Sequence, residues 1–173
     1  MSQLSSLSFT SSINSSLLVR DVAGNYRPAE PAEVLQAALR VLAGQLRGTE
    51  MLSSPQAVRD FLRIKLGTLE HEVFAVIHLD AQHRVIEYVE MFRGTVTQTS
   101  VYPREVVKEA MAHNTAAIVL VHNHPSGVAE PSRADEHLTQ TLKSALSLVD
   151  VRVIDHLIVA GPTILSFAER GLI

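Results

Sequence analysis

The chain has 173 residues, enough for one domain with a proper hydrophobic core and a short appendage. Its 15 Lys and Arg against 18 Asp and Glu give a formal net charge of −3, which argues against a dedicated nucleic-acid binder because phosphate contacts need a surplus of basic residues. The absence of cysteine excludes disulfides, thiol nucleophiles and thiolate metal sites. Any metal must therefore be held by His and carboxylate side chains.

Neither a membrane segment nor an export signal stands out in the sequence. No apolar run approaches the roughly 18 residues of a membrane span. The N-terminus also lacks the basic region and the long apolar region of a secretory signal. We therefore expect a soluble, cytoplasmic protein with no membrane partner.

The N-terminal 66 residues differ in character from the rest of the chain. Eight of the first 16 residues are serine, which predicts a Ser-rich arm over residues 1–30 that ends in a turn-rich segment. Apolar residues recur at helical spacing over 35–46, and Ser54 followed by Pro55 is typical of the start of a second helix. Residues 31–66 are thus expected to form a helical extension.

Residues 67–173 alternate between strand-like and helical patterns. Apolar, partly β-branched runs predict strands, and periodic apolar residues predict helices. The run 116–121 is unbroken and apolar, which is typical of a strand buried on both faces. In chain order we expect strands over 73–79, 85–92 and 95–97, a helix from Pro103, the strand 116–121, a helix over 132–148, and strands over 151–159 and 164–167. This order predicts a mixed α/β fold.

Two histidines stand where the buried strand ends. His122 and His124 are two residues apart, so their side chains can face the same point in space. Asp135 lies in the first turn of the next expected helix, whose N-terminus can fold back over the strand end. Two imidazoles and one carboxylate are the protein ligands of a catalytic zinc site, with water in the fourth position.

Each of these residues also has a simpler interpretation. Ser132 and Asp135 have the spacing of a capping box, in which the serine caps a helix and the acid bonds back to the cap N–H. A His-x-His pair alone is a weak signal, since histidine is common in turns and at strand ends. The combination of a same-face pair with an acid at a helix start is what favours the metal site.

A zinc hydrolase also needs a proton acceptor for its attacking water. Glu70 and Glu72 both precede the strand expected from Val73, and Glu72 stands next to the buried stretch. Its simpler interpretation is a solvated charge before a strand. Asp155 and His156 are weaker candidates, as partners that orient a ligand imidazole. No role is assigned to the remaining histidines, which are His71, His78, His83, His113 and His137.

The pattern as a whole resembles the JAMM motif of JAB/MPN metalloproteases, and its details are closest to the RadC-like branch. The short N-terminal region resembles the short form of this branch that is found on mobile elements, because a helix-hairpin-helix region is not evident. The matching stretches, which cover roughly 67–173, are His71-Glu72-Val73-Phe74, Phe92-Arg93-Gly94-Thr95, Val101-Tyr102-Pro103-Arg104-Glu105-Val106-Val107, His122-Asn123-His124-Pro125-Ser126-Gly127, Pro131-Ser132-Arg133-Ala134-Asp135, Val149-Asp150-Val151-Arg152, Asp155-His156-Leu157-Ile158-Val159 and Ser166-Phe167-Ala168-Glu169-Arg170-Gly171-Leu172.

The resemblance implies a role for each motif residue. His122, His124 and Asp135 are the expected ligands of one Zn²⁺ per chain. Glu72 is the expected base, which takes a proton from the attacking water and passes it to the leaving amine, and Ser132 is expected to hydrogen-bond the oxyanion. The implied fold is an MPN, cytidine-deaminase-like mixed β-sheet flanked by helices over residues 67–173.

The function expected from the resemblance is a zinc metallopeptidase that cleaves a peptide or isopeptide bond with a metal-activated water. The substrate is a peptide or protein of unknown identity. The alternative is an MPN interaction module without turnover, acting in DNA-repair or mobile-element biology, although the charge of −3 gives no support to a nucleic-acid partner. A zinc nucleobase deaminase is excluded because its cysteine ligands are absent.

Overall fold

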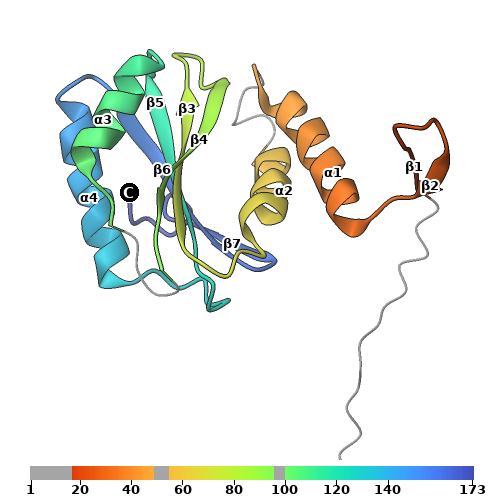
Figure 1. The fold of residues 1–173 in the computed structure, drawn as a ribbon. Helices are drawn as coiled ribbons and strands as arrows, with labels where there is room; N and C mark the ends of the chain where they lie inside the picture. The colour runs from red at the N-terminus through yellow and green to blue at the C-terminus, as the bar shows by residue number, and fades with distance from the viewer. Residues whose placement is uncertain (1–16, 49–54, 96–99) are drawn as a thin grey trace, which may run out of the picture. The chain divides into compact units, whose positions relative to one another are not determined.

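The computed structural model describes residues 17–48, 55–95 and 100–173 (Figure 1). The chain divides into two compact units, Met1–Ala37 and Ala38–Ile173. The Ser-rich stretch and the residue expected to cap the second helix, Ser54, lie outside the described residues. So does most of the strand expected over 95–97.

The described part of the first unit contains a hairpin that the sequence analysis did not predict. Its strands β1 (Leu18–Arg20) and β2 (Tyr26–Pro28) pair antiparallel. The Asp21 carboxylate accepts hydrogen bonds from the backbone N–H groups of Ala23 and Asn25, at 2.9 and 2.8 Å, and so closes the turn. Both strands are mostly exposed, so they lack the apolar alternation by which a strand is recognised.

The second unit is built on a five-stranded sheet with the strand order β4-β3-β5-β6-β7. The pair β5–β6 is parallel and the other pairs are antiparallel, which confirms the expected mixed α/β fold. The strands are β3 (Val73–Leu79), β4 (Val85–Arg93), β5 (Ala117–Asn123), β6 (Arg152–Ala160) and β7 (Thr163–Ser166). The helices are α1 (Pro31–Leu46), which begins in the first unit, α2 (Pro55–Leu66), α3 (Pro103–Ala112) and α4 (Arg133–Ser147).

Helices cover both faces of the sheet (Figure 1). On one face, α2 packs through Phe61 and Leu62 against β3 residues such as Ala75 and Ile77. On the other face, α3 and α4 pack against the alternate residues of β3 and β5, among them Phe74. Side chains of β3 and β5 point alternately to the two faces of the sheet, and helices cover both faces. Every residue of β3 and of β5 is therefore buried.

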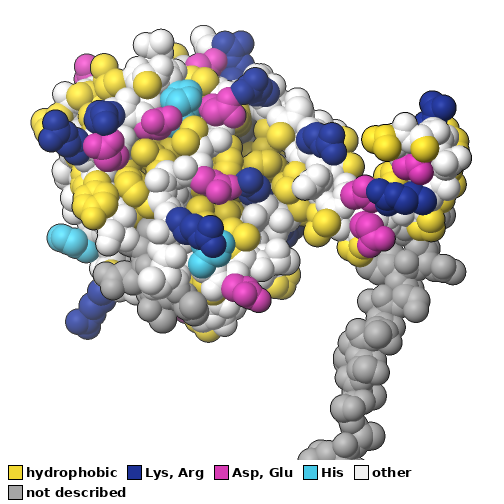
Figure 2. All heavy atoms as spheres, in the orientation of Figure 1, with side chains coloured by type: hydrophobic (Ala, Val, Ile, Leu, Met, Phe, Trp, Pro, Cys, Tyr) yellow, Lys and Arg dark blue, Asp and Glu magenta, His cyan; other side chains and the backbone are white. Residues whose placement is uncertain are grey.

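The charged surface of the second unit is mixed in sign. Lys and Arg side chains are interspersed with Asp and Glu side chains over the face that Figure 2 shows. The ion pairs of the unit include Arg47–Glu87, Lys65–Glu90 and Lys108–Glu105. Within the part of the chain that the structure describes, no helix is long and apolar enough to cross a bilayer.

Candidate metal centre

The histidines of the His-x-His pair lie where β5 ends against its neighbours. His122 is the next-to-last residue of β5, and His124 follows the strand, with its backbone N–H donating to the carbonyl of Val159 at 2.8 Å. The first turn of α4 brings Asp135 to the same place. The Nε2 atoms of His122 and His124 are 2.9 Å apart. One oxygen of Asp135 lies 3.4 Å from His122 Nε2 and the other lies 3.6 Å from His124 Nε2.

The hydrogen bond of His124 fixes which of its nitrogens faces the cluster. Nδ1 lies 2.7 Å from the backbone carbonyl of Val128. A carbonyl can only accept, so Nδ1 carries the hydrogen and donates it. The lone pair of the neutral ring is therefore on Nε2, which points at His122 and Asp135. The Asp135 carboxylate, with a smaller contribution from Glu72, raises the pKa of His124 because both favour a proton on this ring.

A buried chain of hydrogen bonds fixes His122 in the same way. The Thr139 hydroxyl donates to the backbone carbonyl of Asp135 at 2.6 Å, so it must accept from His156 Nδ1, which is also 2.6 Å away. His156 Nε2 then holds a lone pair, and it accepts from His122 Nδ1 at 2.8 Å. This leaves the lone pair of His122 on Nε2. Burial lowers the pKa of His122 to about 4, so the ring is neutral at neutral pH.

The capping box and the metal-site geometry are both present at Asp135. One carboxylate oxygen, Oδ2, accepts from the backbone N–H and from the hydroxyl of Ser132, both at 2.7 Å, and the Asp135 backbone N–H donates to Ser132 Oγ at 3.2 Å. The other oxygen, Oδ1, faces His122. Burial alone would raise the pKa of Asp135, but the neighbouring imidazoles and the Ser132 bonds hold this pKa well below its usual value. The cap thus fixes a carboxylate, kept ionised, beside two imidazoles.

Together these three side chains form a group that can hold a metal ion. It is one of two such groups among the described residues. The donor set fits a zinc-like ion, because each imidazole, when unprotonated, offers its Nε2 lone pair, the other nitrogens are bonded elsewhere, and the carboxylate is ionised. The ring of His122 is buried, whereas His124 and Asp135 are partly exposed, so the site is open on one side.

The structure places Glu72 beside this group through Asn123. The Asn123 side chain is buried; its Oδ1 accepts from the backbone N–H of Val73 at 2.8 Å, and its Nδ2 donates to the carbonyl of His71 at 3.0 Å. These two bonds bracket Glu72. Its own backbone is paired on the other side, where its N–H donates to Thr95 and its carbonyl accepts from Gly94.

Four further polar residues were not assigned to the site or were assigned only weakly. Asn123 and Thr139 were missed. Position 123 lies between the two histidines, so its side chain faces the other side of the strand. Thr139 follows Asp135 by one helical turn, and this spacing could have indicated that it lies near the site. His156 lies 2.8 Å from His122 Nδ1, which is the contact expected of a partner that orients a ligand imidazole. The Asp155 carboxylate instead accepts from the backbone N–H groups of His156 and Ala168 and from the Ser166 hydroxyl.

Comparisons with known proteins agree with the fold and with the family resemblance. The family model of the RadC-like JAB domain matches residues 52–172. Over 150 residues the chain is 61% identical to UPF0758 proteins of Leptothrix cholodnii and of Methylibium petroleiphilum, covering 87% of this chain and 68% of each relative. A UPF0758 protein of Nitrosomonas eutropha is 59% identical over 145 residues, covering 84% of this chain and 65% of that protein. The chain therefore belongs to the RadC-like JAB domain family, as the sequence predicted, and it spans about two thirds of the length of these relatives.

Proposed function

We propose that this protein is a zinc-dependent metallohydrolase that cleaves a peptide or isopeptide bond. The observation that carries the proposal is the convergence of His122 Nε2, His124 Nε2 and the Asp135 carboxylate at the end of β5, with the other nitrogen of each ring already hydrogen-bonded. This is the donor set of a catalytic zinc site that keeps one position open.

Zinc suits these ligands because imidazole and carboxylate together favour it over Mg²⁺ or Ca²⁺, which take oxygen ligands. When bound, the ion would polarise the scissile carbonyl and lower the pKa of the attacking water. His122, His124 and Asp135 would hold it. The hydrogen-bond chain through His156 and Thr139 would keep the His122 ring in the correct tautomer.

Glu72 is the proposed general base. Its backbone is held beside the His-x-His segment by the two bonds of Asn123 and by the pairing with Gly94 and Thr95. A carboxylate in this place can accept a proton from water and return it to the departing amine. Ser132 lies beside the proposed ligands, where its hydroxyl donates to Asp135 Oδ2. To stabilise an oxyanion, this hydroxyl would rotate and donate to the substrate instead.

The test compares the substitutions Glu72→Gln and Glu70→Gln in zinc-loaded protein. Glu70 is exposed and two residues away, so it is a matched control for loss of a carboxylate before β3. The probes are a peptide library with mass-spectrometric detection and a peptide that carries a Lys isopeptide branch. We expect Glu72→Gln to reduce hydrolysis at least 100-fold with zinc content unchanged, and Glu70→Gln to leave the rate as in the wild type.

Two results would count against the proposal. An unchanged rate in Glu72→Gln would remove Glu72 as the base. Absence of any hydrolysis by the zinc-loaded wild type over both probes would favour an interaction module without turnover, whose partner binding would survive Glu72→Gln.

A further inference from the structure

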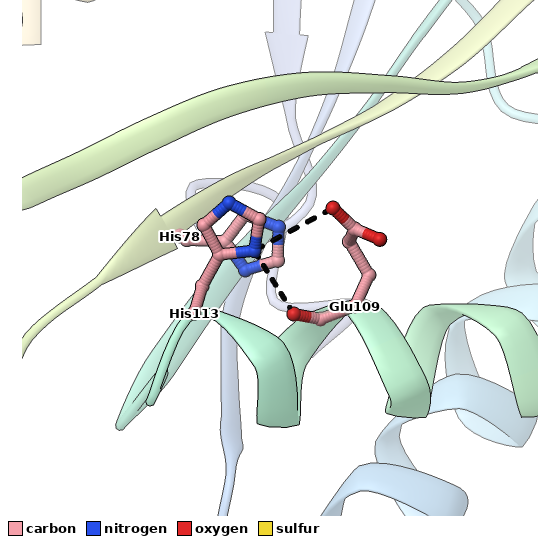
Figure 3. A group of neighbouring side chains, drawn as sticks. All are labelled: His78, Glu109 and His113. Atoms are coloured by element: carbon pink, nitrogen blue, oxygen red, sulfur yellow. Dashed lines mark hydrogen bonds and ion pairs between the residues drawn. The ribbon is translucent and has the colours of Figure 1, made fainter.

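A second group of ligand-type side chains lies at the other end of β3. Figure 3 shows His78, which projects from β3, next to Glu109 of α3 and His113, the residue that ends this helix. One potential ligand atom from each of the three lies within 4.8 Å of the other two. Neither the family motif nor the proposed hydrolysis uses any of these residues.

His78 carries the clearest anomaly of the group. It is fully buried, its Nδ1 lies 2.8 Å from the Thr115 hydroxyl, and its Nε2 is buried without any hydrogen-bond partner. Burial, with a smaller contribution from His113, lowers the pKa of His78 to about 4, so the ring is neutral. Buried polar atoms are nearly always paired, so an orphaned imidazole nitrogen requires an explanation. If Nδ1 donates to Thr115, Nε2 holds a free lone pair, as in a metal-ligating histidine whose other nitrogen is hydrogen-bonded.

Glu109 and His113 supply the other two donors from one helix. They are four residues apart, so they share a face of α3, and His113 Nδ1 lies 3.5 Å from a Glu109 carboxylate oxygen. His113 Nδ1 also donates to the Glu109 backbone carbonyl at 3.0 Å. The C-terminus of a helix carries partial negative charge from its unpaired carbonyls, which favours a cation at this position.

We propose that His78, Glu109 and His113 form a second metal site, for Zn²⁺ or another transition-metal dication that prefers imidazole. Two imidazoles and one carboxylate match such an ion, and they do not match Mg²⁺ or Ca²⁺. The rings of His78 and His113 are stacked, with centroids 4.4 Å apart and planes at 9°. Parallel rings do not direct two lone pairs at one ion, so binding would require the partly exposed His113 ring to turn.

The second site is separate from the first. His78 pairs with Ile118 across β3 and β5, and Phe74 pairs with His122. Four residues along a strand correspond to about 13 Å, so one ion cannot serve both groups. An ion held by His78 and by the end of α3 would connect β3 to the helix that covers it. Its role is therefore structural, and it does not depend on the proposed hydrolysis.

The test counts zinc in a protein whose first site is disabled. Isothermal titration with Zn²⁺ is carried out on His122→Ala, on His122→Ala with His113→Ala, and on His122→Ala with His137→Ala as the control for removal of an exposed histidine on α4. We expect one equivalent of zinc per chain in the first and third proteins and none in the second. Zinc should also raise the thermal midpoint of the first and third proteins but not of the second.

Substitution of the two partly exposed ligands, Glu109 and His113, keeps the experiment interpretable, because buried His78 is left in place. The substitution Glu109→Gln in the His122→Ala background should weaken zinc binding at least 10-fold while circular dichroism stays unchanged. The proposal is wrong if His122→Ala binds no zinc, or if its remaining zinc is unaffected by both His113→Ala and Glu109→Gln. Failure of the first site would appear differently, as equal zinc in the wild type and His122→Ala.

Discussion

Two histidines and one carboxylate lie beside each end of β3, yet the two groups differ in how their rings are oriented. At the end next to His122, each ring has its second nitrogen bonded, to Val128 and to His156, so both Nε2 lone pairs point inward. At the end next to His78, the rings stack and one Nε2 has no partner. Both groups have a partner behind each ring, which in the second group is the Thr115 hydroxyl for His78 and the Glu109 carbonyl for His113. What prepares the first site is therefore the convergence of its two Nε2 atoms, 2.9 Å apart, beside the Asp135 carboxylate. We therefore expect the first group to bind zinc more tightly than the second.

The largest expected effect comes from removing the carboxylate of the first group. Asp135→Ala should abolish zinc binding at the His122 end and also remove the carboxylate half of the capping box. Ser132→Ala removes the hydroxyl half of the capping box and leaves the carboxylate, so it should retain the zinc and lose only about 1 kcal/mol of unfolding free energy. Zinc titration together with urea unfolding separates the two roles of Asp135. Zinc retained in Asp135→Ala at wild-type affinity would show that this carboxylate is not a ligand.

A smaller effect is expected at Asn123, whose side chain is bonded to the backbone on both sides of Glu72 and to none of the three metal ligands. Asn123→Asp keeps an acceptor for the Val73 N–H and loses the donor to the His71 carbonyl. A displacement of about 1 Å at a catalytic group can cost about 100-fold in rate. We expect a hydrolysis rate lowered by that order with zinc content unchanged. A normal rate would mean that the Asn123 bonds do not set the position of Glu72.

The substitution Thr139→Val tests the chain of bonds behind His122. It preserves the side-chain shape and removes the acceptor for His156 Nδ1. Loss of such an outer partner weakens metal binding by about 10- to 100-fold, and we expect the lower end because His156 itself remains. Thr141→Val is the matched control, since the Thr141 hydroxyl also bonds a carbonyl one turn back but is exposed. Equal zinc affinities in the two variants would contradict the claim that the bonds through Thr139 and His156 keep the His122 lone pair on Nε2.

The smallest effect is expected at the end of β3 that holds the second group. Thr115→Val removes the partner of His78 Nδ1 and should weaken zinc binding there several-fold, while the His122 end keeps its affinity. Zinc titration of Thr115→Val in the His122→Ala background measures this. The two groups share only the strands between them, so they are expected to bind zinc independently. A changed zinc affinity of the His122 group in Thr115→Val would contradict this independence.

The sequence predicted the sheet well because its central strands are continuous apolar runs. Residues 73–79 form β3 as expected, and β5 extends the expected run 116–121 by including His122 and Asn123. The short, exposed strands of the β1–β2 hairpin carry no such signal. The convergence of His122, His124 and Asp135 follows from side-chain alternation and from a helix start, both of which are local patterns. The bonds of Asn123 depend on the register between β3 and β5, and the stacking of His78 on His113 depends on where α3 ends over the sheet, so neither could be predicted from local patterns.

The central claim is that the His122 end of β5 holds zinc. It is tested most directly by the zinc content of the wild type and of His122→Ala, both purified without a metal-chelating tag and measured by inductively coupled plasma mass spectrometry. The account predicts one zinc fewer per chain in His122→Ala. Equal zinc content in the two proteins would contradict it.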